Sequence, residues 1–199
     1  ADELMILFAR DLLERAPGTG IIADVKSSQV LFDDIERHGG VPIMWKAGHS
    51  LIKDKMRREK ALLAGELSGH LFFAERYFGY DDAVYAGGRL LEILTNSKRG
   101  LRNLLADVPR PAATPEIRLE CADDRKFAVV EALTRTFKEE GRSVIDVDGA
   151  RVQFEGGWGL VRASNTEPAL VLRFEARDEE RLEEIRGGFM ERVRRAVGP

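Results

Sequence analysis

The sequence has one cysteine and no long apolar run, and each absence excludes a class of protein. Cys121 has no partner for a disulfide within the chain, so we expect a reducing compartment, the cytoplasm, and interpret Cys121 as a small core residue. No apolar stretch reaches the roughly 20 residues that span a bilayer. No signal peptide is recognisable either, so we expect no membrane association.

An excess of charge of one sign is also missing. The 199 residues carry a formal net charge of −3, and the basic residues form no stripe, so we expect no nucleic-acid partner. Only three histidines are present, His38, His49 and His70, and their spacing is not that of metal ligands. We therefore expect no metal or other cofactor in this chain.

Residues 1–108 alternate helical and strand-like patterns. The helical patterns cover 2–15, a stretch from Ser27 or Ser28 to Gly39-Gly40, 50–60, and a stretch from Asp81 or Asp82 to about Leu94. Short apolar stretches at 21–25, 41–45, 61–64 and 71–73 are typical of strands. The repeated β-α-β units predict an α/β domain, with a mainly parallel sheet covered by helices on both faces.

The pattern changes after residues 107–115, which contain three prolines and predict a linker, so we place a domain boundary between residues 108 and 109. Residues 109–199 predict a small α+β domain with an antiparallel sheet. Asp123 or Asp124 is expected to cap its first helix, which would bury a face carrying Phe127, Val130, Leu133 and Phe137. Asp148-Gly149 indicates a hairpin, 169–176 a strand, and 178–196 a closing helix.

Three polar segments follow the predicted parallel strands. Ligands of such sheets bind beyond the carboxyl ends of the strands, so we expect one shared rim, formed by Lys26, His49, Glu66, Ser68 and His70. A carboxylate and a serine hydroxyl suit the hydroxyls of a sugar, and a histidine can bind phosphate or move a proton. The same composition also fits an exposed polar turn, with one histidine at a helix start and the other packed in a strand.

A second polar segment, residues 162–168, lies between two predicted strands of the later domain. Arg162 offers a planar fork of donors that matches phosphate, and Ser164, Asn165 and Thr166 add further hydrogen-bonding groups. Backbone N–H groups in such a turn can form an anion-binding nest. A plain hairpin loop with a left-handed asparagine is the alternative. Together, the rim and this loop suggest a site for a phosphorylated polyol such as a sugar phosphate.

The chain resembles the α-D-phosphohexomutases, most closely their bacterial phosphomannomutase/phosphoglucomutase branch. The resemblance covers nearly the whole chain in order and rests on residues 24–28, 44–53, 65–73, 77–82 and 157–168. It implies that Glu66 and Ser68 contact sugar hydroxyls in the third of four domains, and that Lys26 and His49 approach the substrate. It also implies that His70 assists proton transfer.

The same resemblance implies that Arg162, Ser164, Asn165 and Thr166 form the phosphate-binding loop of the fourth domain, which is similar to the TATA-box-binding-protein fold. The implied reaction interconverts the 1- and 6-phosphates of glucose or mannose through a bisphosphorylated sugar and a phosphoserine. The family's phosphoserine and Mg²⁺ loop belong to its first and second domains and have no counterpart here. The stretch 146–149 is too short, and in the wrong domain, to replace that loop.

We therefore expect this chain to be the third and fourth domains of a longer mutase, inactive by itself, with the missing first and second domains as its partners. Its first residue is not methionine and lies at the start of a helical pattern, which favours this interpretation. The alternative is a stand-alone, non-catalytic module that binds sugar phosphates or another protein.

Overall fold

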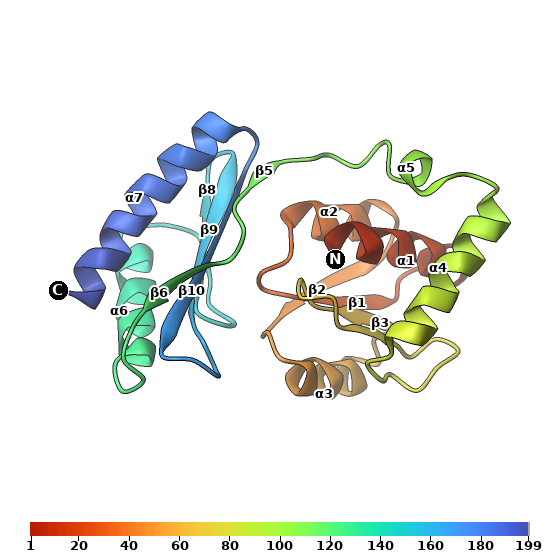
Figure 1. The fold of residues 1–199 in the computed structure, drawn as a ribbon, viewed down its shortest axis with the longest axis horizontal. Helices are drawn as coiled ribbons and strands as arrows, with labels where there is room; N and C mark the ends of the chain where they lie inside the picture. The colour runs from red at the N-terminus through yellow and green to blue at the C-terminus, as the bar shows by residue number, and fades with distance from the viewer. Residues whose placement is uncertain (199) are drawn as a thin grey trace. The chain divides into compact units, whose positions relative to one another are not determined.

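The computed structural model describes residues 1–198, which fold into two compact units (Figure 1). The first unit runs from Ala1 to Pro109, and the second begins at Arg110. Each unit has a sheet and an apolar core of its own, so each qualifies as a domain. The first is an α/β domain and the second an α+β domain.

A four-stranded sheet forms the centre of the first unit, in the order β2-β1-β3-β4. β1 (Gly20–Asp24) pairs in parallel with β2 (Val41–Trp45) and β3 (Leu63–Gly65), whereas β4 (Leu71–Phe73) runs antiparallel to β3. The helices of this unit are α1 (Asp2–Arg15), α2 (Gln29–Arg37), α3 (His49–Glu59), α4 (Ala83–Ser97) and α5 (Leu101–Leu104). The mainly parallel sheet expected from the sequence is thus confirmed.

Helices cover both faces of this sheet. α1, α2 and α4 share one core with Ile21 and Leu63 of the sheet. α3 covers the opposite face, where Ile52 and Met56 pack in one cluster with Phe72. Full burial of an apolar side chain of this size is worth roughly 1.5–3 kcal/mol, so the two cores hold the strands, and the loops that follow them, in place.

Local signals in the sequence place two helix starts of the first unit. Ser28 begins α2 and Asp82 begins α4, and a side-chain oxygen of each accepts a hydrogen bond from the backbone of the first turn. The third strand differs from expectation, because it begins at Leu63 rather than at Ala61. The left-handed Lys60 ends α3, and the N–H of Ala61 is still engaged by that helix.

An antiparallel sheet forms the second unit, in the order β5-β10-β9-β8-β7, with β6 also paired to β10. Its strands are β5 (Ala112–Ala113), β6 (Ile117–Glu120), β7 (Val144–Ile145), β8 (Ala150–Phe154), β9 (Gly157–Ala163) and β10 (Ala169–Ala176). α6 (Lys126–Glu139) and α7 (Glu179–Val197) pack on one face (Figure 1), with Phe137 and Phe189 stacked 4.8 Å apart between ring centres. Cys121 belongs to this core, as expected.

Two expectations for α6 are wrong. Neither Asp123 nor Asp124 caps the helix, since its N-cap is Arg125 and the carboxylate of Asp123 instead binds the Nζ of Lys126 at 2.6 Å. Phe127 is 60% exposed rather than buried. The buried residues of α6 are Lys126, Val129, Val130, Leu133 and Phe137, so three of the four expected core positions are confirmed and the buried face begins at Lys126 rather than at Phe127.

Part of the proline-rich stretch is ordered structure rather than plain linker. Ala112 and Ala113 form the short strand β5 against the end of β10. Directly after it, Thr114 donates its N–H to the carbonyl of Phe174 at 3.0 Å, and its Oγ1 accepts from the N–H of Phe174 at 3.1 Å. The second unit therefore begins its pairing within the predicted linker.

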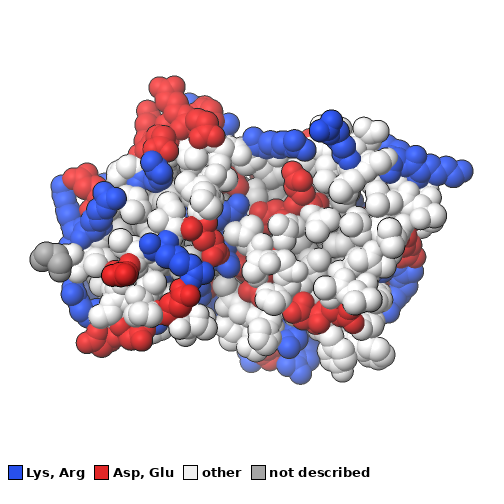
Figure 2. Space-filling view, in the orientation of Figure 1, with Lys and Arg blue, Asp and Glu red and all other residues white. Residues whose placement is uncertain are grey.

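Charged side chains of both signs are interspersed on the face shown in Figure 2. Acidic residues gather over the start of α7, where Glu179 and Glu180 occupy the first turn and favour the helix N-terminus. Among residues 1–198, no helix is both long and apolar enough to cross a membrane.

Candidate functional site

The carboxyl ends of the parallel strands place three polar segments at one edge of the first unit. The turn after β3 is closed by two backbone hydrogen bonds, from Glu66 N to His70 O and from Gly69 N to Glu66 O, each of 2.9 Å. Gly69 has a φ of +102°, a conformation that L side chains rarely adopt, so this position requires glycine. The turn projects the side chains of residues 66, 68 and 70 from a fixed backbone.

Glu66 connects the turn after β3 to the turn after β2. Its Oε1 accepts a hydrogen bond from the N–H of Gly48 at 2.7 Å. Its Oε2 is buried and has no hydrogen-bond partner among the described residues. A buried acceptor without a partner costs free energy, so Oε2 is suited to accept a hydrogen bond from a ligand.

Asp24, at the end of β1, is a second buried carboxylate at this edge. Burial raises the pKa of Asp24 and the charge of Glu66 raises it further, while nearby Lys26 and the hydroxyl of Ser27 oppose that shift. The Nζ of Lys26 lies 3.5 Å from Asp24 Oδ2, and the Oγ of Ser27 donates to Oδ1 at 3.0 Å. Asp24 thus contacts both Lys26 and Ser27 in the segment that follows β1. Its role was not predicted from the sequence, although an acid inside an apolar strand is a visible signal.

The two histidines of the rim lie near each other. The ring centres of His49 and His70 are 6.1 Å apart. His49 begins α3, and the Nδ1 of His70 lies 2.6 Å from the Oδ2 of Asp81. Ser68 is exposed in the same turn. The structure therefore brings the five expected rim residues to one edge of the sheet, and it adds Asp24 and Asp81, which the sequence analysis did not assign.

In the second unit, the loop between β9 and β10 carries the expected phosphate-binding residues. Arg162, at the end of β9, donates from Nε to the Oδ2 of Asp148 at 2.9 Å. Its Nη2 is buried and has no hydrogen-bond partner among the described residues. The guanidinium is therefore held on one side and has an unused donor on another, which suits a phosphate oxygen.

The backbone of this loop differs from an open anion-binding nest. The Oγ of Ser164 accepts hydrogen bonds from the N–H groups of Thr166 and Glu167, at 3.3 and 3.2 Å. These two donors therefore turn inward, as in other serine-stabilised turns. The side chains of Asn165 and Thr166 remain exposed. Arg162 and the exposed side chains, rather than this pair of N–H groups, are available to a ligand.

Lys126 holds the far end of the same loop. Its Nζ donates to the carbonyl of Glu167 at 2.9 Å, and its side chain is buried. Arg118 of β6 forms an ion pair with the carboxylate of Glu167. Lys126 was not predicted from the sequence, because a lysine at the start of a helix resembles an ordinary exposed lysine.

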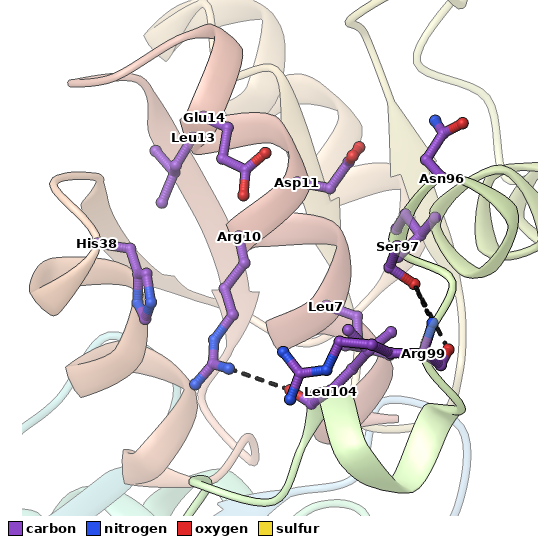
Figure 3. A pocket seen from close by; sticks show the side chains of 11 residues that line it. Leu7, Arg10, Asp11, Leu13, Glu14, His38, Asn96, Ser97, Arg99 and Leu104 are labelled. Carbon is purple, nitrogen blue, oxygen red and sulfur yellow. Dashed lines mark hydrogen bonds between the residues drawn. The ribbon is translucent and has the colours of Figure 1, made fainter.

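The first unit also has a cavity of about 520 Å³ (Figure 3), and none of the rim residues is in its lining. It is lined by α1, α4, α5 and the C-terminal end of α2, where His38 lies, so it is at the amino end of the parallel strands. Arg10 in its wall is fully engaged, with Asp34, Asp107 and the carbonyl of Leu104. His38 and Ser97 in its lining also have hydrogen-bond partners within the fold, the carbonyls of Asp34 and Leu94.

Within residues 1–198, no group of three or more His, Cys, Asp or Glu side chains could hold a metal ion. The described residues therefore do not fit a Mg²⁺ site.

Comparisons with known proteins identify relatives of both units. The family model described as "Phosphoglucomutase/phosphomannomutase, alpha/beta/alpha domain III" matches residues 1–111, and the family's C-terminal domain matches 116–192. The chain is 50% identical over 193 residues to the phosphomannomutase/phosphoglucomutase of Pseudomonas aeruginosa, covering 97% of this chain and 42% of that protein. It is 47% identical over 190 residues to the phosphoglucomutase of Neisseria gonorrhoeae, covering 94% and 41%. The chain thus spans about two fifths of these relatives.

Solved structures agree with these matches. A phosphoglucomutase/phosphomannomutase family protein from Burkholderia thailandensis superposes with a TM-score of 0.88 at 42% identity, covering 98% of this chain and 41% of that one. The N-acetylphosphoglucosamine mutase of Aspergillus fumigatus, solved with GlcNAc-6P and magnesium, gives a TM-score of 0.70 at 15% identity, covering 100% and 44%. The second match shows a shared fold alone.

Proposed function

Because the chain belongs to the phosphoglucomutase/phosphomannomutase family, we propose that it is the sugar-phosphate-binding part of a longer mutase. That mutase would reversibly interconvert hexose 1-phosphates and hexose 6-phosphates. The names of the relatives, phosphomannomutase/phosphoglucomutase and phosphoglucomutase, support the phosphates of glucose and mannose as substrates.

The observation that carries the proposal is a pair of buried polar atoms without partners among the described residues. One is an acceptor, Glu66 Oε2, and the other a donor, Arg162 Nη2. A sugar hydroxyl would donate to the first, and a phosphate oxygen would accept from the second. One ligand class, a sugar phosphate, supplies both groups.

In this proposal the first unit recognises the sugar and the second its phosphate. Glu66 and Ser68 hold sugar hydroxyls, and Lys26 and His49 approach the ligand. Arg162, Ser164, Asn165 and Thr166 bind the phosphate that does not react, and His70 moves a proton. Binding energy at these groups positions the sugar for phosphoryl transfer, which depends chiefly on positioning and charge stabilisation.

The chemical step would belong to the rest of the mutase, which we expect to supply the phosphoserine and to bind Mg²⁺. The metal would neutralise charge on the transferred phosphoryl group. We therefore propose that this chain has no mutase activity alone, that its domains are residues 1–108 and 109–199, and that the mutase acts in the cytoplasm.

Isothermal titration of the purified chain with glucose 1-phosphate tests the binding role. We expect saturable binding that is lost in Arg162→Ala and retained in Arg135→Ala, which removes an exposed arginine of α6 paired with Glu131. Equal binding by both variants would contradict the role of Arg162. If the chain alone does not bind, the same variant is tested in the intact mutase. A normal kcat/KM for Arg162→Ala would then exclude a role of Arg162 in phosphate binding.

A further inference from the structure

We propose that Asp81 is a positioning residue for His70, holding its imidazole in the tautomer whose Nε2 is a free base. The inference rests on the proposed mutase function, in which His70 moves a proton. Asp81 lies eleven positions later in the chain and directly before the cap of α4, so it reaches His70 only through the folded structure.

Two contacts and a backbone bridge fix the carboxylate of Asp81. Its Oδ2 lies 2.6 Å from the Nδ1 of His70, and its Oδ1 accepts from the N–H of Leu71 at 3.3 Å. The backbone of Asp81 also forms an antiparallel bridge with Phe72 of β4. Because both oxygens contact the same short stretch, 70–71, the carboxylate has little freedom to turn away from the ring.

The neighbouring acid, Asp82, is committed elsewhere. Its Oδ1 accepts from the N–H of Tyr85 at 2.9 Å, and its Oδ2 accepts from the hydroxyl of Tyr77 at 2.6 Å. The adjacent aspartates therefore have separate tasks, one capping α4 and the other facing His70.

The chemistry of the contact determines where the imidazole proton lies. An ionised carboxylate has no proton to give, so the Nδ1 of His70 must be the donor. A neutral ring that is protonated at Nδ1 carries its lone pair at Nε2. Nε2 has no hydrogen-bond partner among residues 1–198, which leaves it open to a ligand hydroxyl.

That tautomer suits the reaction of a phosphohexomutase. When a sugar hydroxyl attacks phosphorus, a lone pair of its oxygen forms the new O–P bond, and the P–O bond to the serine oxygen breaks with its electron pair left on that oxygen. The hydroxyl proton must leave, and Nε2 accepts it as a general base. The opposite tautomer would present an N–H and could not accept that proton.

Nuclear magnetic resonance of the ring nitrogens tests the assignment on this chain directly. In the unmodified protein above the titration range of histidine, we expect His70 to be protonated at Nδ1. In Asp81→Asn, the amide oxygen still accepts the hydrogen bond from the N–H of Leu71, and the amide NH₂ donates to Nδ1 of His70. The imidazole proton should therefore move to Nε2. A backbone amide spectrum that otherwise matches the unmodified chain shows that the variant is folded.

Two controls separate this effect from general disturbance. Asp54→Asn removes an exposed acid paired with Arg58 on α3 and should leave His70 unchanged. His38, whose Nδ1 lies 2.8 Å from the carbonyl of Asp34, should stay protonated at Nδ1 in every variant. An unmodified His70 protonated at Nε2, or an unchanged tautomer in Asp81→Asn, would overturn the proposal.

A kinetic experiment on the intact mutase distinguishes this proposal from the proposed function. We expect Asp81→Asn to lower kcat about 100-fold, with KM changed less than about threefold, because a general base contributes at least this much to rate and little to binding. An unmodified mutase without activity would refute the proposed function and leave the resonance experiment to decide the role of Asp81. An active mutase whose variant keeps full kcat would refute the positioning role.

Discussion

Asp148 holds Arg162 by one edge of its guanidinium. The contact joins Nε to Oδ2 at 2.9 Å, across the hairpin of β8 and β9, and leaves Nη2 without a partner among the described residues. Both side chains are largely buried, at 7% and 18% exposure. An arginine fixed in this way loses less conformational entropy when it binds phosphate than a free one would.

The first prediction concerns the acid of this pair. We expect Asp148→Ala to weaken glucose 1-phosphate binding about fivefold, because a hydrogen bond that orients Arg162 is lost. Asp148→Asn keeps an oxygen that can accept from Nε and should change the affinity less than about twofold. Titration calorimetry measures both, with Asp146→Ala as the control, since Asp146 pairs with Lys138 instead. Equal losses in the Ala and Asn variants would show that charge, and not orientation, matters.

A second prediction concerns Gly149, which precedes β8 beside Arg162. Its φ is +82°, and a Cβ there would overlap the carbonyl oxygen of Val161 and lie 2.8 Å from the Cα of Arg162. We expect Gly149→Ala to lower the free energy of unfolding by at least about 2 kcal/mol. Gly141 has a similar φ of +76° but open space around it, so Gly141→Ala should cost only about 1 kcal/mol. Urea unfolding followed by Trp158 fluorescence, in a Trp45→Phe background, makes the comparison.

The buried carboxylate of Asp24 gives a third prediction, on pH. Burial raises its pKa above the ordinary value, so in the window between the two values the folded state binds more protons than the unfolded state. The contribution of Asp24 to the free energy of unfolding therefore rises as the pH falls through the raised pKa. An asparagine at this position does not titrate, so Asp24→Asn lacks this pH dependence. We expect the free energy of unfolding of the unmodified chain, minus that of Asp24→Asn, to increase as the pH is lowered from about 7 to about 4.5. A difference independent of pH would contradict this expectation.

Arg89 gives a fourth prediction, of opposite sign in pH. It is buried and contacts carboxylates from three parts of the first unit, Asp11 at 3.2 Å, Glu75 at 3.0 Å and Glu92 at 3.1 Å. Burial by itself would raise the pKa of Glu75, but hydrogen bonding and charge from Arg89 lower it overall. The stabilisation that Glu75 gains from Arg89 is present above the ordinary pKa of Glu75 and is lost as the pH falls through the lowered value.

We therefore expect Arg89→Met to cost about 3 kcal/mol at pH 7, because it removes the buried cation that Asp11, Glu75 and Glu92 share. The deficit should shrink as the pH falls toward 3, because protonation of these carboxylates removes their attraction to Arg89. Arg76→Met, which removes a half-exposed partner of Glu92, should cost less than about 1 kcal/mol. Urea unfolding at both pH values provides the measurement, and a deficit that stays constant with pH would argue against the ion-pair explanation.

Much of the fold could be predicted from the sequence because the decisive patterns are local. The strand expected at 169–176 coincides with β10, whose alternation of apolar and polar residues is long enough to define its ends. The rim also follows from local patterns, since repeated β-α-β units alone place the ends of β1, β2 and β3 side by side.

The partners of the key side chains could not be predicted, because they depend on pairing between distant segments. Asp148 meets Arg162 only through the register of β8 against β9, and Asp81 meets His70 only where the chain returns along β4. Phe127 shows the limit of a periodic pattern, since the later positions are buried as expected while Lys126, rather than Phe127, is buried in the first turn.

The edge strand β2 affects how readily the first unit aggregates at high concentration. The N–H of Val41 points inward, to the carbonyl of Thr19, so the next backbone nitrogen along the strand, that of Pro42, points outward. Proline has no hydrogen to donate, and an outer edge without a continuous row of donors is a poor template for a strand from another molecule. This flank of the sheet therefore resists aggregation even though no further strand from residues 1–198 covers it.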